Sequence, residues 1–291
     1  MDHHLETDRH APTAEIAPSS DGTAYEEEQR RLSDVPSDWH AGDILLDRDD
    51  FQIRLASRRG MIESRLLVDR RYSWRGYKRS THLAPVSEAD EITLQVCRGT
   101  AVFGTLTVRF DSDRGLAADL LYGDEIDARR QAGATVAELT RLAVDPNLGS
   151  KEVLGTLFHH AYICVDRLRN ASDVFIEVHP RHVPFYRRML KFRRAGECKM
   201  SPRVEAPAVL LHVEVAYVGE QAGLYGGRGV AANRSLYPYF CSPQKEAAAI
   251  QRLLDLGRME TSGADTLASA RPNVHAALGR GRAGHAEGIA A

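Results

Sequence analysis

The run TVAELTRLAVD, Thr135–Asp145, has the apolar composition of a core strand but carries Glu138 and Arg141 in its interior, besides Asp145 at its end. On a strand, Glu138 and Thr140 point to one face and Arg141 to the other, unless a bulge re-aims the arginine. A carboxylate in a core strand is costly unless a cation pairs with it or it opens onto a wet cleft. Glu138 is therefore either half of a structural ion pair or a base that removes a proton from an amine, directly or through water. Arg141 would orient Glu138 or grip a substrate carboxylate.

The sequence on both sides of this run predicts further strands and helices. Ser150 is expected to cap an amphipathic helix that ends near Asn170, and the next strand is rich in β-forming residues on both faces, as a central parallel strand should be. Strands that precede a strand–helix–strand unit predict an α/β (α+β) fold, with a central mixed sheet flanked by helices. The expected strands are 51–56, 91–97, 101–110, 135–145, 173–179 and 208–216, and the expected helices are 58–77, 122–132, 150–170, 182–192 and 243–257.

Charge and composition divide the chain. Residues 1–42 hold ten acidic side chains against three arginines and lack periodicity, so we expect them to be disordered. The folded body is expected over residues 43–217. An extension over 218–261, which contains the helix at 243–257, and a flexible Gly/Ala-rich tail over 262–291 are expected to follow.

Several function classes are disfavoured by composition. No apolar run approaches the roughly 20 residues needed to span a bilayer, and the first residues do not form a secretory signal. Four cysteines lie far apart with no CxxC pair, which indicates reduced thiols, a cytoplasmic protein and no structural metal. His179 and His182 flank Pro180 without an evident third ligand, so no metal site is expected there. The whole chain has a net charge of −2, while residues 1–42, with ten acidic side chains and three arginines, contribute −7. The part after residue 42 therefore has a net charge of about +5, which suits an acidic partner. Nucleic acid is less suitable because no aromatic residues are interleaved among the basic clusters.

Two further groups have possible chemical roles. Amides in the turn Leu148-Gly149-Ser150, at the start of the helix, would bind an anion such as a phosphopantetheine phosphate, although many helices begin this way and bind nothing. The turn lacks a glycine-rich run, which favours one phosphate over a pyrophosphate. Tyr186 would protonate a leaving thiolate, or would simply pack its ring on the sheet with its hydroxyl at the rim.

The chain resembles the N-acyl amino acid synthases, acyltransferases of the GNAT superfamily related to the acyl-homoserine-lactone synthases. The resemblance covers roughly residues 44–217. Glu138, Thr140 and Arg141 match the Glu-x-Ser/Thr-Arg motif of the lactone synthases, whose N-terminal Arg/Phe/Trp pattern has only loose counterparts here, which argues against a lactone product. The segments that carry the resemblance are Arg75-Gly76-Tyr77, Ala137–Val144, Val178–His182 with Phe185–Phe192, and Arg203–Leu211.

The resemblance implies an enzyme that moves a long acyl chain from an acyl carrier protein thioester to the amino group of an amino acid. The thioester would lie where the strands at 135–145 and 173–179 splay apart. Glu138 would assist deprotonation of the amine, and Tyr186 or water would protonate the thiol. Leu148, Gly149, Ser150 and Thr140 would hold the donor, which is a substrate carried on acyl carrier protein or coenzyme A rather than a bound cofactor. An acetyl-CoA-dependent GNAT N-acetyltransferase and a non-catalytic GNAT-like binding domain are the alternatives.

Overall fold

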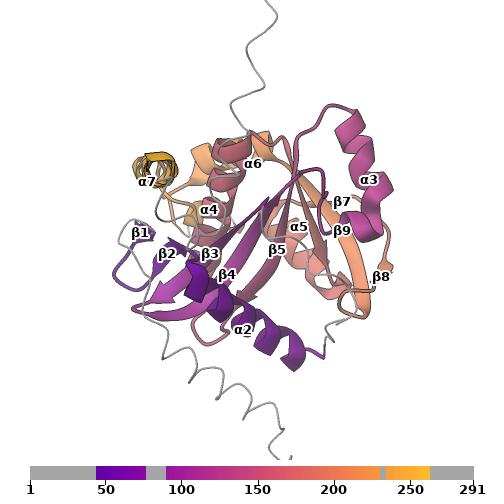
Figure 1. The fold of residues 1–291 in the computed structure, drawn as a ribbon, viewed down its shortest axis with the longest axis horizontal. Coiled ribbons are helices and arrows are strands. Elements are labelled where there is room, and N and C mark those ends of the chain that lie inside the picture. The colour runs from indigo at the N-terminus through magenta and orange to yellow at the C-terminus, as the bar shows by residue number, and fades with distance from the viewer. Residues whose placement is uncertain (1–43, 77–89, 230–233, 263–291) are drawn as a thin grey trace, which may run out of the picture. The chain divides into compact units, whose positions relative to one another are not determined.

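The computed structural model describes residues 44–76, 90–229 and 234–262 (Figure 1). The acidic segment expected over 1–42, and the tail expected over 262–291 except for Ser262, lie outside the described residues.

A mixed sheet forms the centre of the described chain, in the order β1-β2-β3-β4-β5-β6-β9-β7, with β8 paired to β9. All pairs are antiparallel except β5 with β6, which is parallel because α4 forms the crossover between them. The strands are β1 (Ile44–Asp47), β2 (Gln52–Leu55), β3 (Glu91–Arg98), β4 (Ala101–Phe110), β5 (Val136–Val144), β6 (Asp173–Val178), β7 (Arg193–Arg194), β8 (Lys199–Ser201) and β9 (Ala206–Glu214). The expected fold class is therefore confirmed.

Helices cover both faces of this sheet (Figure 1). Val136 of β5 packs in one apolar cluster with Tyr122 and Ile126, whereas Ala137 and Leu139 belong to the cluster that contains the next helix of the chain. Because side chains alternate along a strand, the helix that contains Tyr122 and Ile126 and the helix that follows it lie on opposite faces of the sheet. The helices are α2 (Arg58–Trp74), α3 (Asp119–Gln131), α4 (Lys151–Arg169), α5 (Val183–Leu190), α6 (Val215–Tyr225) and α7 (Pro243–Ser262), with 3₁₀ turns η3 (Pro180–His182) and η4 (Tyr237–Tyr239).

The caps of α4 follow the sequence prediction. The Ser150 side chain accepts a hydrogen bond from the Val153 amide at 3.1 Å, which satisfies one of the amide groups that the first turn leaves open. Asn170 ends the helix in the left-handed conformation, with φ of 48°. The Ser150 cap defines the residue at which α4 begins, and so defines the end of the turn that connects β5 to α4.

Some elements differ from the prediction. The sequence patterns do not indicate β1, β7, β8 or α6. The alternation of Val213-Glu-Val-Ala predicts that the strand continues through Val215 and Ala216, yet these residues begin α6, which crosses the boundary expected at residue 217. Gly257 predicts a helix stop, but α7 continues through it to Ser262, since a single glycine costs a helix only about 1 kcal/mol.

The hydrogen-bonded pairing of β5 is irregular on both of its edges, next to the candidate site. Parallel pairing with β6 ends at the partners Glu138 and Phe175, although both strands continue beyond this point. On its other edge, β5 carries a bulge, because Thr140 pairs with Thr107 while Ala143 pairs with Thr105. Arg141, inside the bulge, has a φ of 54°.

Candidate active site

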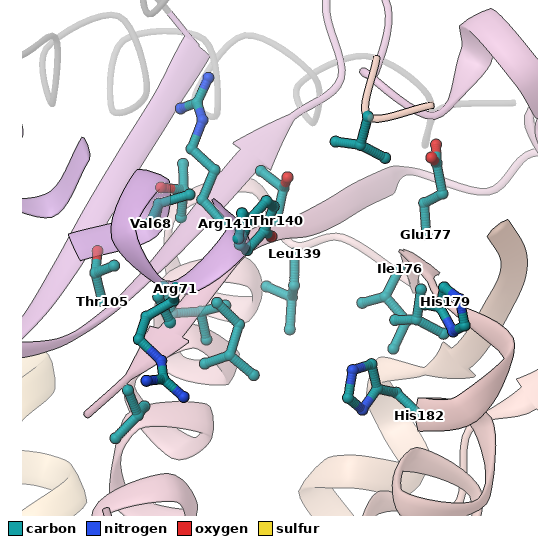
Figure 2. A pocket seen from close by; sticks show the side chains of 18 of the residues that line it. Val68, Arg71, Thr105, Leu139, Thr140, Arg141, Ile176, Glu177, His179 and His182 are labelled. Atoms are coloured by element: carbon teal, nitrogen blue, oxygen red, sulfur yellow. The ribbon is translucent and has the colours of Figure 1, made fainter. Parts of the chain in front are cut away.

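A cavity of about 980 Å³ lies where β5 and β6 part (Figure 2). Its walls come from α2, α4, η3, the start of α5, strands β3 to β6, and β8 and β9 with the segment that joins them. The gap that the sequence interpretation required between these strands is therefore present and is not filled by packed side chains. The unpaired edges of both strands face it.

The cavity has an apolar and a polar side. Figure 2 shows Leu139 and Thr140 pointing in opposite directions, and likewise Ile176 and Glu177, as alternation along the two strands requires. The apolar side lies toward α4 and α5 and includes Leu139, Leu154, Phe158, Ile176, Phe185 and Tyr186. The polar side includes Thr140, Arg141, Glu177, Ser201 and Arg203.

Glu138 lies beside the polar side but is not among the residues that line the cavity. Its side chain is buried, and its Oε2 accepts hydrogen bonds from the Ala117 and Ala118 amides at 2.7 and 3.2 Å. These amides precede α3, so the carboxylate anchors the start of that helix. Burial raises the pKa of Glu138 above its ordinary value, against the opposing effects of Arg203 and Arg109. The structure therefore places Glu138 neither in bulk solvent nor in direct contact with the cavity.

Arg141 is re-aimed by the β5 bulge and lines the cavity. Its Nη1 lies 2.5 Å from Glu91 Oε2, and the other Glu91 oxygen pairs with Arg109. Glu91 and Arg109 are almost completely buried, whereas the Arg141 side chain is about one-third exposed. This three-member network carries a net positive charge and holds Arg141 at the cavity wall.

Arg203 and Glu177 form a second ion pair on the polar side, with Arg203 Nη2 2.6 Å from Glu177 Oε2. Burial lowers the pKa of Arg203, but Glu177, Glu138 and Tyr72 together raise it above its ordinary value. Ser201 lies in the same wall, and its hydroxyl is buried with no hydrogen-bond partner. None of these three residues has a role predicted from the sequence. The sequence signals for Arg203 were its charge, just before the apolar run of β9, and its place in a segment that carries the family resemblance.

Tyr186 lies on the apolar side, packed edge-on against the rings of Phe158, Phe185 and Phe192. Burial, and then Tyr72, raise the pKa of its phenol well above the ordinary value. The phenol therefore stays protonated at neutral pH, which is the form that can donate a proton. Both sequence interpretations, packed ring and proton donor, are compatible with this position.

Basic side chains at the end of α2 and histidines of η3 and its flank line the cavity, and Figure 2 shows Arg71 across the gap from His179 and His182. His182 Nε2 lies 3.3 Å from Arg75 Nη1 and accepts a hydrogen bond from Arg181 Nε at 3.2 Å. Burial and the neighbouring arginines lower the pKa of His182 to about 4, so its ring is neutral at pH 7. Within the described residues, no group of three His, Cys, Asp or Glu side chains is placed to hold a metal ion.

The expected phosphate turn lies at the edge of the site. Leu148, Gly149 and Ser150 do not line the cavity, although Val144 before them and Leu154 after them do. The Leu148 and Gly149 amides donate to the Asp145 carbonyl at 3.2 and 2.8 Å, so they serve the turn itself. The structure thus brings together Thr140, Arg141 and Tyr186, and leaves Glu138 and the turn outside the wall.

The neutral state of His182 predicts a pH-dependent stability. Because folding lowers its pKa from the ordinary value of 6.5 to about 4, the unfolded chain binds more protons between these values. The stabilisation is present above pH 6.5 and is lost as pH falls toward 4. His182→Gln keeps an acceptor for the arginines but cannot titrate.

We expect the fall in urea midpoint between pH 7 and pH 5 to be smaller in His182→Gln than in the unchanged protein. His160, whose pKa burial also lowers to about 4, leaves part of the slope in both proteins. Identical slopes would show that His182 takes up its proton equally readily in the folded and unfolded states.

Comparison with known proteins gives one family match. A family model described as FeeM, N-acyl amino acid synthase, matches residues 63–214. The solved structure of FeeM from uncultured soil microbes is 26% identical with a TM-score of 0.53, covering 57% of this chain and 91% of that chain. An acyl-CoA N-acyltransferase from Pseudomonas aeruginosa is 13% identical with a TM-score of 0.40, covering 56% and 97%. The AHL synthase LasI is 12% identical with a TM-score of 0.41, covering 57% and 90%. No curated protein sequence gives a significant match.

Proposed function

The chain belongs to the FeeM family of N-acyl amino acid synthases, and we propose on that premise that it joins a long acyl chain to the amino group of an amino acid. The family resemblance and the GNAT fold expected from the sequence are confirmed, and the chain is an acyltransferase. The donor and the acceptor are the parts that we propose. None of the helices in residues 44–76, 90–229 and 234–262 is long and apolar enough to cross a bilayer.

The two-sided cavity is the observation that carries this proposal. A fatty acyl chain would occupy the apolar side, near Leu139, Phe158 and Ile176, where burial of each methylene contributes about 0.8 kcal/mol. An acetyl group would leave most of that side empty, which argues for a long chain. The amino acid would occupy the polar side, with its carboxylate at Arg203. The thioester carbonyl would then lie at the gap between the strands.

Direct aminolysis suits this arrangement. The amine nitrogen attacks the thioester carbon, a backbone amide on an unpaired strand edge stabilises the oxyanion, and the C–S bond breaks. Protonated Tyr186 or water supplies a proton to the thiolate. Glu138 receives the amine proton through an intervening water, because its carboxylate does not reach the cavity wall.

We propose an acyl carrier protein as donor. Arg71 and Arg75 line the cavity at the end of α2, and such a basic rim favours an acidic partner and a phosphate. Thr140 lines the cavity and remains a proposed contact for the phosphopantetheine arm. The turn Leu148-Gly149-Ser150 lies outside the cavity wall, and its Leu148 and Gly149 amides already donate to Asp145, so we propose that it contacts the phosphate of the arm only through the N-terminus of α4, which favours an anion. An acyl-CoA donor would present the same arm.

The direct test supplies the purified protein with long-chain acyl carrier protein, long-chain acyl-CoA or acetyl-CoA, each with a mixture of amino acids. We expect N-acyl amino acids with long chains, detected by mass spectrometry, and faster formation from the carrier protein. Acetylated products alone would identify an N-acetyltransferase. Donor binding without any new amide would identify a binding domain.

The substitution Glu138→Gln distinguishes a catalytic role of Glu138 from a structural role in anchoring α3. The amide oxygen of glutamine can still accept hydrogen bonds from Ala117 and Ala118, so the unfolding free energy should change little. If Glu138 takes the amine proton, the steady-state rate should fall roughly 10²–10⁴-fold. Turnover close to that of the unchanged enzyme would restrict Glu138 to anchoring α3.

Arg203→Gln tests the acceptor assignment. Loss of a charge-assisted pair to the acceptor carboxylate should lower kcat/KM for the amino acid by roughly 10–100-fold. The methyl ester of the same amino acid, which lacks the carboxylate, should lose much less. Arg194→Gln is the matched control, because Arg194 is an exposed arginine that lies outside the cavity. Equal losses for amino acid and ester would place the carboxylate elsewhere.

A further inference from the structure

A second, smaller cavity lies behind the apolar side of the active-site cavity. It has a volume of about 30 Å³ and only aliphatic and aromatic residues line it. Leu139 and Phe158 line both cavities, so these two side chains form the partition between them. An apolar void of this kind stays dry and accepts an apolar guest, and its size suits roughly a methyl group or two.

The far wall of this second cavity comes from a part of the chain beyond the family match, which ends at residue 214. Val215 and Val218 of α6 form one part of this wall. Tyr237 and Phe240, in and next to η4, form another part. All four residues are buried. The C-terminal part of the chain thus closes the far end of the small cavity, which adjoins the active-site cavity at Leu139 and Phe158.

Several directional contacts fix the segment at 236–241 in place. The Leu236 amide donates to the Met189 carbonyl at 2.9 Å, and the Tyr237 hydroxyl donates to the Leu190 carbonyl at 2.7 Å. Both acceptors belong to α5. A wall held to α5 by such bonds is expected to resist displacement when a ligand enters.

Contacts with α4 complete the attachment. The Cys241 amide donates to His159 Nδ1 at 2.9 Å, and the Phe240 ring stacks on the same imidazole with centroids 4.7 Å apart. Gly155 permits the close approach, because a β-carbon there would lie 2.6 Å from Tyr239 Cβ. The segment is therefore built against the same helix that supplies Phe158 to the partition.

We propose that α6 and residues 236–241 form the end wall of the acyl-binding site and set the longest acyl chain that the enzyme accepts. This inference rests on the proposed function, since it requires a fatty acyl donor. The distal carbons pass the partition at Leu139 and Phe158 and end against Val218, Tyr237 and Phe240. Since one methylene in an apolar pocket changes specificity by roughly 10–200-fold, a wall of this kind discriminates sharply.

Substitutions at Val218 provide the test. Val218→Ala deepens the end of the site and Val218→Leu fills it. Two profiles are measured for each protein over saturated chains of graded even length. One is the set of N-acyl amino acids formed from a mixture of acyl carrier protein donors, and the other is the thermal shift caused by S-alkyl pantetheine thioethers, which bind without transfer.

We expect both optima to move about two carbons longer in Val218→Ala and about two carbons shorter in Val218→Leu, with roughly tenfold changes for the longest accepted chain. Leu253→Ala is the control, because Leu253 is a buried residue of α7 that lines neither cavity. Its melting temperature should fall while its length profile stays unchanged.

The two readouts separate the two claims. Movement of the thioether profile without any amide product would overturn the synthase function and support the end wall. Amide formation with profiles that do not move at Val218 would overturn the end wall and support the synthase function. Absence of both thioether binding and product would overturn both.

Discussion

The end of parallel pairing between β5 and β6 is the constraint on which the site depends. After Glu138 and Phe175, each strand stays bonded to its outer neighbour but turns an unpaired edge toward the other. Unpaired backbone groups in a core are costly, so they must be satisfied by a ligand or by solvent in the cavity. The same opening separates side chains that alternation sends to opposite faces. One local loss of hydrogen bonds therefore creates a cavity with an apolar and a polar side.

Buried ion pairs are the second feature that defines the cavity. Glu91 links Arg109 to Arg141, and Glu177 pairs with Arg203, so the polar side is arranged before any substrate arrives. Buried ion pairs rarely add to stability, because the desolvation cost of each ion offsets most of their attraction. They hold charged side chains in fixed positions along the polar side of the cavity, where the proposed aminolysis would change the charge of the substrate.

The sequence predicted the elements whose signals are local. Periodicity and capping placed β3, β4 and α4 within one or two residues, and the charged run at 135–145 indicated the strand at the centre of the site. The residues that act across long sequence distances were not predictable. Glu138 bonds to amides about 20 positions earlier, and the ion pair of Glu177 depends on a segment 26 positions later. The start of α6 was not predicted because Val215 continues the alternation of β9, and only packing against α4 and η4 selects the helix.

Because Gly155 has no side chain, residues 236–241 of the C-terminal part can pack closely against α4. The surface of α4 around Gly155 and His159 is covered by residues 236–241, so the family boundary at residue 214 is not a structural boundary. A chain shortened there would leave this surface of α4 exposed. Chimaeras between relatives should therefore exchange α4 together with the C-terminal part, so that Gly155 and the backbone near Tyr239 that packs against it are transferred together.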